Sequence, residues 1–422
     1  MFVEWLSFSL VGVAALAIAA GLGSTPQWRV VRDLLIAGVA LRIVGVFARH
    51  AMIFDLYGGG SDAVGYFGVG SAIAEHLRAL DFSIIGSDQW GERQWGTQAV
   101  RYASGLVIAF VGPSIRAAFL VFSLAAFTGL ACMTVAFRRA RPSGSMRPSA
   151  LFLFLWPTLW FWPSSIGKEA VLLLAIGLVV LGYVGRAERI HWIPMIGGLA
   201  LAMAIRPHLA GLLAVSICVA EWASRGWTVR RIAQSVLASA LAIWLLVVAL
   251  DLLGLAGADF DGLQAFVSDT ARRTNQGGSA FARGGSLAAA IPMAFVNILC
   301  RPFVTEVHNP MALVSSLEMM AFWALAIRFR RRLWSVLRSW RTSRLLRLVI
   351  PFALFYILMI GISFQNLGII ARQRALVMPA LLLVLAEVSA AQTRRVAVAS
   401  PQRRRRLWNT PTPALAPAGR PS

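Results

Sequence analysis

The chain has 422 residues, of which 58% are hydrophobic and only 14% charged, and its mean hydropathy is +0.70. A soluble globular chain is about half apolar and about a quarter charged, so this sequence has too little polar surface to cover itself in water. These figures exclude the soluble classes and indicate a multi-pass membrane protein.

The apolar stretches that are long enough to cross a bilayer give the predicted elements. In chain order they are about 5–22, 33–54, 115–137, 149–163, 168–185, 192–205, 208–223, 232–253, 311–327, 348–364 and 375–391. Residues 67–80 are predicted to form an amphipathic helix between the second and third stretches. The expected fold is therefore an all-α, polytopic transmembrane helical bundle with about eleven crossings and additional re-entrant or interfacial helices.

The net charge of +22 is a topology signal. Most of the basic residues lie in short segments that contain very few acids, namely 29–32, 138–147, 186–189, 225–231, 328–347 and 394–420. The positive-inside rule places these segments in the cytoplasm and the N-terminus outside. The piece 287–300 then cannot be a full crossing, because that would move the arginines of 328–347 outside; we expect it to be re-entrant or interfacial.

The same charge distribution indicates the partners. The arginine runs 330–332 and 403–406 are expected to lie against anionic membrane lipids. An RNA-binding groove with interleaved aromatic residues is not recognisable, so no nucleic-acid partner is expected. The first apolar stretch lacks a basic n-region, and we interpret it as a retained helix in a cell membrane.

The three cysteines carry no signal of a disulfide or zinc site. Cys132, Cys218 and Cys300 lie inside apolar stretches, without a CxxC motif or a His/Cys pair.

Two carboxylates, Asp55 and Asp62, follow the stretch 33–54 around the glycine run 58–60. Glycines allow a close approach of backbone to ligand, and a carboxylate at the outer membrane face can act as a general base for a hydroxyl. The alternative is that Asp62 only caps the following helix.

Two further positions break apolar stretches at the predicted outer end. Lys168, the only lysine, and Glu169 begin one helix, where Glu169 could simply complement the helix dipole. Arg206 and His208 flank a proline; an arginine there could grip a phosphate, or could only snorkel to the interface.

Similar reasoning selects residues near the C-terminal stretches. Arg301 with Glu306 and His308, and the pair Arg372 and Arg374, are candidates for binding an anionic substrate, with interfacial anchoring as the alternative. The glycine-rich loop 254–286 adds Arg272, Arg273 and Arg283, which suit either a flap over an anionic substrate or an ordinary solvated loop.

The order of these parts resembles the GT-C superfamily of polyprenyl-phosphate-sugar-dependent glycosyltransferases. The resemblance covers roughly residues 33–290, including outer loops 55–103 and 254–286; residues 1–32 are an additional N-terminal helix, 291–393 hold the C-terminal helices, and 394–422 form a disordered basic tail. Short motifs are also similar to those of uncharacterised membrane proteins of bacterial surface-polysaccharide clusters: Phe161-Trp162-Pro163-Ser164-Ser165, Lys168-Glu169, Arg206-Pro207 and Ala371-Arg372-Gln373-Arg374.

The resemblance implies an inverting transfer of a sugar from a polyprenyl-phosphate-linked donor to a glycan or lipid acceptor on the extracytoplasmic face. Asp62 would be the base, and Arg206, Arg301 and Arg372 or Arg374 would hold the donor phosphate. The sequence lacks the dense grouping of an all-protein metal site, although Asp55 or Asp62 could share a magnesium ion with substrate phosphate.

Three other readings stay open. An O-antigen-type polymerase or ligase would rely on Arg272, Arg273, Arg283 and His308, and would tolerate neutralisation of Asp62. A lipid-linked glycan transporter or flippase would place a midplane site between broken helices. A non-catalytic assembly subunit is the third.

Overall fold

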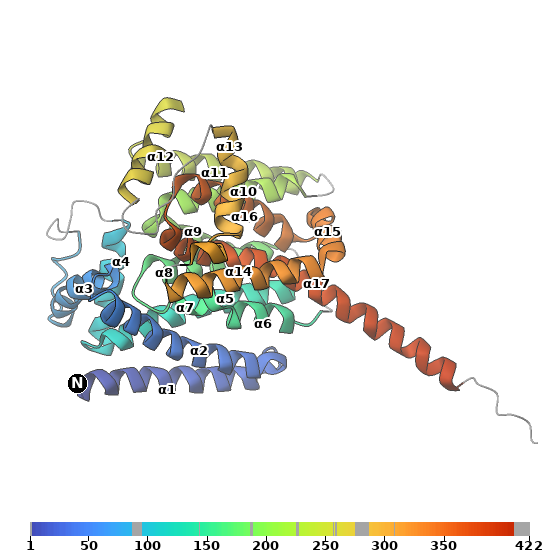
Figure 1. The fold of residues 1–422 in the computed structure, drawn as a ribbon, viewed down its shortest axis with the longest axis horizontal. Helices are drawn as coiled ribbons and strands as arrows, with labels where there is room; N and C mark the ends of the chain where they lie inside the picture. The colour runs from blue at the N-terminus through green and yellow to red at the C-terminus, as the bar shows by residue number, and fades with distance from the viewer. Residues whose placement is uncertain are drawn as a thin grey trace, which may run out of the picture.

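The computed structural model describes residues 2–86, 95–142, 144–185, 189–224, 228–255, 257, 260–274, 287–307 and 309–408. Every regular element in this part of the chain is helical, which confirms the all-α class (Figure 1). The helices are α1 (Phe2–Ser24), α2 (Arg32–Ala51), α3 (Asp62–Arg78), α4 (Thr97–Val111), α5 (Ile115–Ala140), α6 (Arg147–Leu155), α7 (Pro157–Phe161), α8 (Lys168–Val184), α9 (Trp192–Ile205), α10 (Pro207–Trp222), α11 (Val229–Leu252), α12 (Phe260–Thr274), α13 (Leu287–Leu299), α14 (Pro310–Arg328), α15 (Arg330–Arg338), α16 (Arg344–Ser363) and α17 (Leu367–Trp408).

Six helices in the described residues are long and apolar enough to cross a membrane: α1, α5, α11, α14, α16 and α17. The expected count of about eleven crossings is therefore not confirmed. The expected crossing 149–163 is broken at a proline, because α6 ends at Leu155 and α7 begins at Pro157. The break between α9 and α10 at Pro207 lies where the sequence predicted it.

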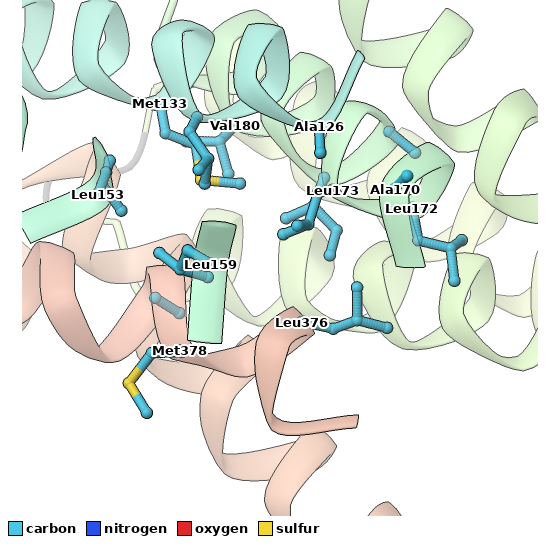
Figure 2. Packing of buried hydrophobic residues seen from close by; sticks show 14 of the residues in the cluster. Ala126, Met133, Leu153, Leu159, Ala170, Leu172, Leu173, Val180, Leu376 and Met378 are labelled. Atoms are coloured by element: carbon cyan, nitrogen blue, oxygen red, sulfur yellow. The ribbon is translucent and has the colours of Figure 1, made fainter. Parts of the chain in front are cut away.

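The centre of the bundle is the contact of α5 with α8. A Cβ atom on Gly129 would collide with the Leu173 carbonyl, and one on Gly177 would collide with the backbone of Gly129, so these helices can approach only because both positions are glycine. Ala126, Leu173 and Leu376 belong to the apolar core around this contact (Figure 2). In α17 83% of the apolar window is buried, the largest share among the six candidate spans.

Helices α3 and α4 form a hairpin at one end of the bundle (Figure 1). Gly70 and Gly105 bring the two helices together, and Arg78 donates to the carbonyls of Ile108 and Ala109 at the C-terminal end of α4. The predicted amphipathic helix 67–80 is thus present, but it begins five residues earlier, at Asp62.

The basic helix α15 lies at the opposite end, where α17 also leaves the bundle (Figure 1). Two of the basic segments predicted to share a side of the membrane meet directly, because Arg147 binds Asp33 at 2.5 Å and the Val30 carbonyl at 3.1 Å. These contacts fit the predicted grouping of segments. Which face is cytoplasmic stays a prediction.

In the described residues, which resume at Leu287, helix α13 has 13 residues and so spans about 20 Å, less than a hydrocarbon core of about 30 Å. It packs on α16, where Gly361 lies against Ala294. Its length fits the expected re-entrant or interfacial piece. At the C-terminus, α17 continues as helix to Trp408, and residues 409–422 lie outside the described part.

Candidate functional site

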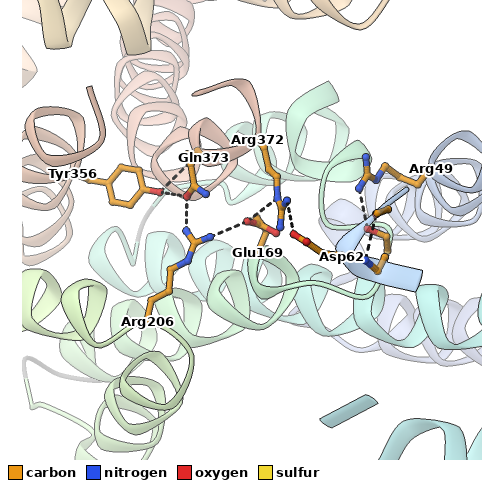
Figure 3. A network of polar contacts seen from close by, with 10 residues as sticks. Arg49, Asp62, Glu169, Arg206, Tyr356, Arg372 and Gln373 are labelled. Atoms are coloured by element: carbon orange, nitrogen blue, oxygen red, sulfur yellow. Dashed lines mark hydrogen bonds and ion pairs between the residues drawn. The ribbon is translucent and has the colours of Figure 1, made fainter. Parts of the chain in front are cut away.

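The ends of helices that are distant in the sequence meet in one polar cluster (Figure 3). We define the outer cluster as Arg49, Asp62, Lys168, Glu169, Arg206, Tyr356, Arg372 and Gln373. These residues come from α2, α3, α8, the α9–α10 break, α16 and α17. The name follows the predicted topology.

Asp62 is the first residue of α3, and Ser61 is the residue that caps this helix. The Ser61 side chain accepts from the Ala63 backbone N–H at 3.3 Å, so the capping alternative for Asp62 does not describe the observed contact. The Asp62 carboxylate instead accepts from Arg372, with 3.3 Å between Oδ2 and Nη1, and its side chain is 64% exposed. A group with that exposure can still meet a substrate.

Glu169 is the buried anchor of the cluster. Its Oε1 atom lies 2.9 Å from Arg372 Nε and 3.2 Å from Arg206 Nη2, while its side chain is only 4% exposed (Figure 3). Glu169 also lies in the first turn of α8, where a carboxylate complements the helix dipole. One carboxylate therefore holds two arginines from two other elements.

The α9–α10 break is fixed to α16 and α17 through a glutamine. Arg206 donates to Gln373 Oε1, which also accepts from the Tyr356 hydroxyl at 3.1 Å. The Tyr356 hydroxyl lies equally close to the Gln373 carbonyl. This arrangement adds an uncharged contact to the ion pair that Arg206 makes with Glu169.

Lys168 projects toward the α3–α4 hairpin. Its Nζ donates to the Thr97 hydroxyl at 3.1 Å, and it interacts electrostatically with Arg206, Glu169, Asp62 and Arg372.

Two neighbours complete this side of the cluster. Burial raises the pKa of Tyr66, and the nearby Asp62 carboxylate raises it further, so the phenol stays neutral. His208 lies near Arg206 and Lys168.

Arg49 joins the cluster from α2, although the sequence analysis did not select it. It is 6% exposed, donates to Ser165 Oγ at 3.2 Å and lies over the rings of Phe161 and Trp162. It interacts electrostatically with Glu169 and Arg372. The cluster thus has four cationic side chains and two carboxylates, which gives it an excess of positive charge.

A signal for Arg49 exists in the sequence. Arg42 and Arg49 are charged residues inside an apolar stretch, and such residues are costly enough to suggest function. Tyr356 was not selected from the sequence, and Gln373 was noted only as part of the motif Ala371-Arg372-Gln373-Arg374 without a role of its own. An uncharged residue in an apolar helix gives no comparable signal.

Arg301, Glu306 and Arg374 form a separate group at the C-terminal end of α13. Arg374 is fully buried and donates to the Ile298 carbonyl at 2.8 Å, to Ser315 Oγ at 3.0 Å and to the Arg301 carbonyl. Arg301 Nε binds Glu306 at 2.8 Å, and Glu306 also accepts from the Phe303 N–H. These side chains hold protein groups and shape the loop between α13 and α14.

The remaining predicted residues lie elsewhere. Asp55 is exposed in the π-helical turn Met52–Leu56 and makes none of the cluster contacts described above. Arg272 and Arg273 are 80% exposed and pair with Asp269 on their own helix, α12. Arg283 and His308 lie outside the described residues.

Within the described residues, no three His, Cys, Asp or Glu side chains are grouped so that they could hold a metal ion. Comparisons with protein-family models, curated proteins and solved structures give no match to this chain. The residues of the outer cluster therefore carry the functional argument.

Proposed function

We propose that the protein is a membrane glycosyltransferase that moves a sugar from a polyprenyl-phosphate-linked donor to a cell-envelope glycan or lipid acceptor on the extracytoplasmic face. The observation that carries the proposal is the juxtaposition of one exposed carboxylate, Asp62, with a surplus of cationic side chains at the ends of apolar helices. A base and a phosphate-binding surface are the two parts that such a transfer needs.

In the proposed reaction the acceptor hydroxyl transfers its proton to Asp62 while its oxygen attacks the anomeric carbon. The bond from that carbon to the phosphate oxygen breaks, and the configuration at the carbon inverts. The polyprenyl phosphate leaves with the bonding electron pair, and its growing negative charge is stabilised by Lys168, Arg206 and Arg372. No metal ion is needed for this balance.

The other predicted residues have supporting roles in this proposal. Glu169 keeps Arg206 and Arg372 in place, since it binds both guanidinium groups. Arg301, Glu306 and Arg374 hold the α13–α14 loop and do not contact substrate. Arg272 and Arg273 of α12 are exposed and pair with Asp269 in their own helix. These contacts do not join them to the outer cluster, so they give no support to the polymerase or ligase alternative.

The test is complementation of a deletion strain of the native host with Asp62→Asn and with Asp55→Asn as the matched control. Membrane expression is equalised, and surface glycans and polyprenyl-linked precursors are measured by mass spectrometry. Loss of a general base typically lowers a rate about 10²- to 10⁴-fold. We expect Asp62→Asn to lose one glycan and accumulate its lipid-linked donor, while Asp55→Asn restores synthesis.

Full rescue by Asp62→Asn would overturn the mechanism. Equal loss of the glycan in both variants would show that synthesis needs Asp55 as much as Asp62, and would remove the specific role of Asp62.

A further inference from the structure

The guanidinium group of Arg372 contacts two carboxylates, each through a different nitrogen atom. Nε lies 2.9 Å from Glu169, and Nη1 lies 3.3 Å from Asp62. Because separate atoms make the two contacts, one can break while the other stays. Figure 3 shows Arg372 between the two acidic residues.

The two contacts differ in strength. The Glu169 side chain is 4% exposed, whereas that of Asp62 is 64% exposed and its contact is the longer one. Exposed ion pairs contribute little to stability, while breaking a buried pair is strongly unfavourable. An anion that competes for Arg372 should therefore displace Asp62 and leave Glu169 in place.

Arg372 also donates a hydrogen bond to the carboxylate of Asp62, the proposed general base. In the part of the chain that the structure describes, no other side chain donates to the Asp62 carboxylate. While this contact exists, the guanidinium group occupies Oδ2 of Asp62, and that oxygen cannot accept the proton of a hydroxyl.

From this geometry we infer that Arg372 keeps Asp62 inactive until the phosphate of the lipid donor takes over the exposed side of the guanidinium group. The inference rests on the proposed function and adds an order of binding: the donor binds first, and only then can Asp62 accept the proton of the acceptor. The step involves an exchange of ion pairs and no covalent change. The chemical class that triggers it is the phosphodiester monoanion that links a polyprenyl chain to the sugar, and polyprenyl phosphate, the leaving group of that donor, serves as its probe.

The test follows the reactivity of Asp62 in the purified full-length protein. A water-soluble carbodiimide and an amine convert accessible carboxyl groups into amides, which peptide mass spectrometry quantifies by position. Asp55 is the internal reference because it is exposed and outside the cluster. The probes are a polyprenyl phosphate, the uncharged polyprenol and inorganic phosphate, each with binding measured in parallel.

We expect the polyprenyl phosphate to raise the labelling rate of Asp62 about two- to fivefold, the factor that an exposed ion pair is worth. Labelling of Asp55 should not change, Glu169 should stay unlabelled, and the polyprenol should have no effect. Arg372→Gln should give fast labelling of Asp62 without any ligand. If Arg372→Gln does not fold, the labelling of Asp62 in the wild-type protein with and without polyprenyl phosphate tests the inference by itself.

Three results would overturn the inference: binding of the polyprenyl phosphate without faster labelling of Asp62, slower labelling of Asp62 on binding, or no binding. An equal rise with inorganic phosphate would overturn the lipid donor as the occupant. Failure of the proposed function is a separate result, because it would be seen as rescue by Asp62→Asn in cells whatever the labelling shows.

Discussion

Glu169 and Arg372 form an ion pair in which Oε1 and Nε are 2.9 Å apart and the carboxylate is almost completely buried. The pair joins the first turn of α8 to the first turns of α17. Because Glu169 also binds Arg206, this single carboxylate connects three parts of the chain that the sequence separates widely.

Glu169→Gln should therefore destabilise the fold strongly. Removing one partner of a buried pair leaves uncompensated charge and costs about 3–5 kcal/mol. Thermal unfolding of the purified protein in detergent measures the effect. The control is Asp33→Asn, which breaks the exposed Asp33–Arg147 pair and should cost at most about 1 kcal/mol. Similar melting temperatures for the two variants would contradict the assignment of Glu169 as a buried anchor.

Two glycine-to-alanine substitutions should differ in their effect on the stability of the fold. Gly129→Ala places a methyl group against the Leu173 carbonyl of α8, and overpacking of this kind typically costs about 1–3 kcal/mol. Gly197→Ala, on α9, meets open space and should be neutral or stabilising, because alanine favours a helix over glycine by about 0.5–1 kcal/mol. Unfolding temperatures measured side by side test the difference, and a stabilised Gly129→Ala would refute the close α5–α8 contact.

Arg42→Met should raise stability. The Arg42 side chain is fully buried and donates to the Leu159 carbonyl, but its Nε and Nη2 atoms have no hydrogen-bond partner within the described residues. Burying unpaired polar groups costs about 1–3 kcal/mol each by protein mutational data, so an apolar side chain of similar length should gain at least about 1 kcal/mol. A lower melting temperature would show that the single hydrogen bond to α7 outweighs this cost.

Cysteine accessibility tests the predicted orientation. In a background without Cys132, Cys218 and Cys300, exposed positions in α3 and α15 are replaced as Glu75→Cys and Ser335→Cys. A membrane-impermeant maleimide applied to intact spheroplasts should label position 75 and should label position 335 only after lysis. The reverse pattern would invert the topology, and labelling of both without lysis would contradict the placement of α3 and α15 at opposite ends.

Much of the outer cluster could be predicted because its charges interrupt apolar stretches. Asp62, Lys168, Glu169, Arg206 and Arg372 all stand at such interruptions, and the structure brings them together. Their joint location follows from the alternation of helices, which sends every second helix end to the same side.

The sequence could not separate Arg372 from Arg374. The two residues are chemically alike, and two positions along a helix correspond to a rotation of about 200°. Arg372 reaches the cluster, while Arg374 points to the C-terminal end of α13. Which face of α17 meets which neighbour depends on packing that a list of apolar residues does not contain.

Arg372, Gln373 and Arg374 are consecutive, yet each binds a different part of the molecule. A turn of α17 by one residue, about 100°, would break all three sets of contacts together. We therefore expect α17 to keep its rotational setting in any movement of the bundle. The glycine run 58–60, which joins α2 to Asp62, is less tightly surrounded, since a Cβ atom on Gly58 or Gly59 would touch nothing.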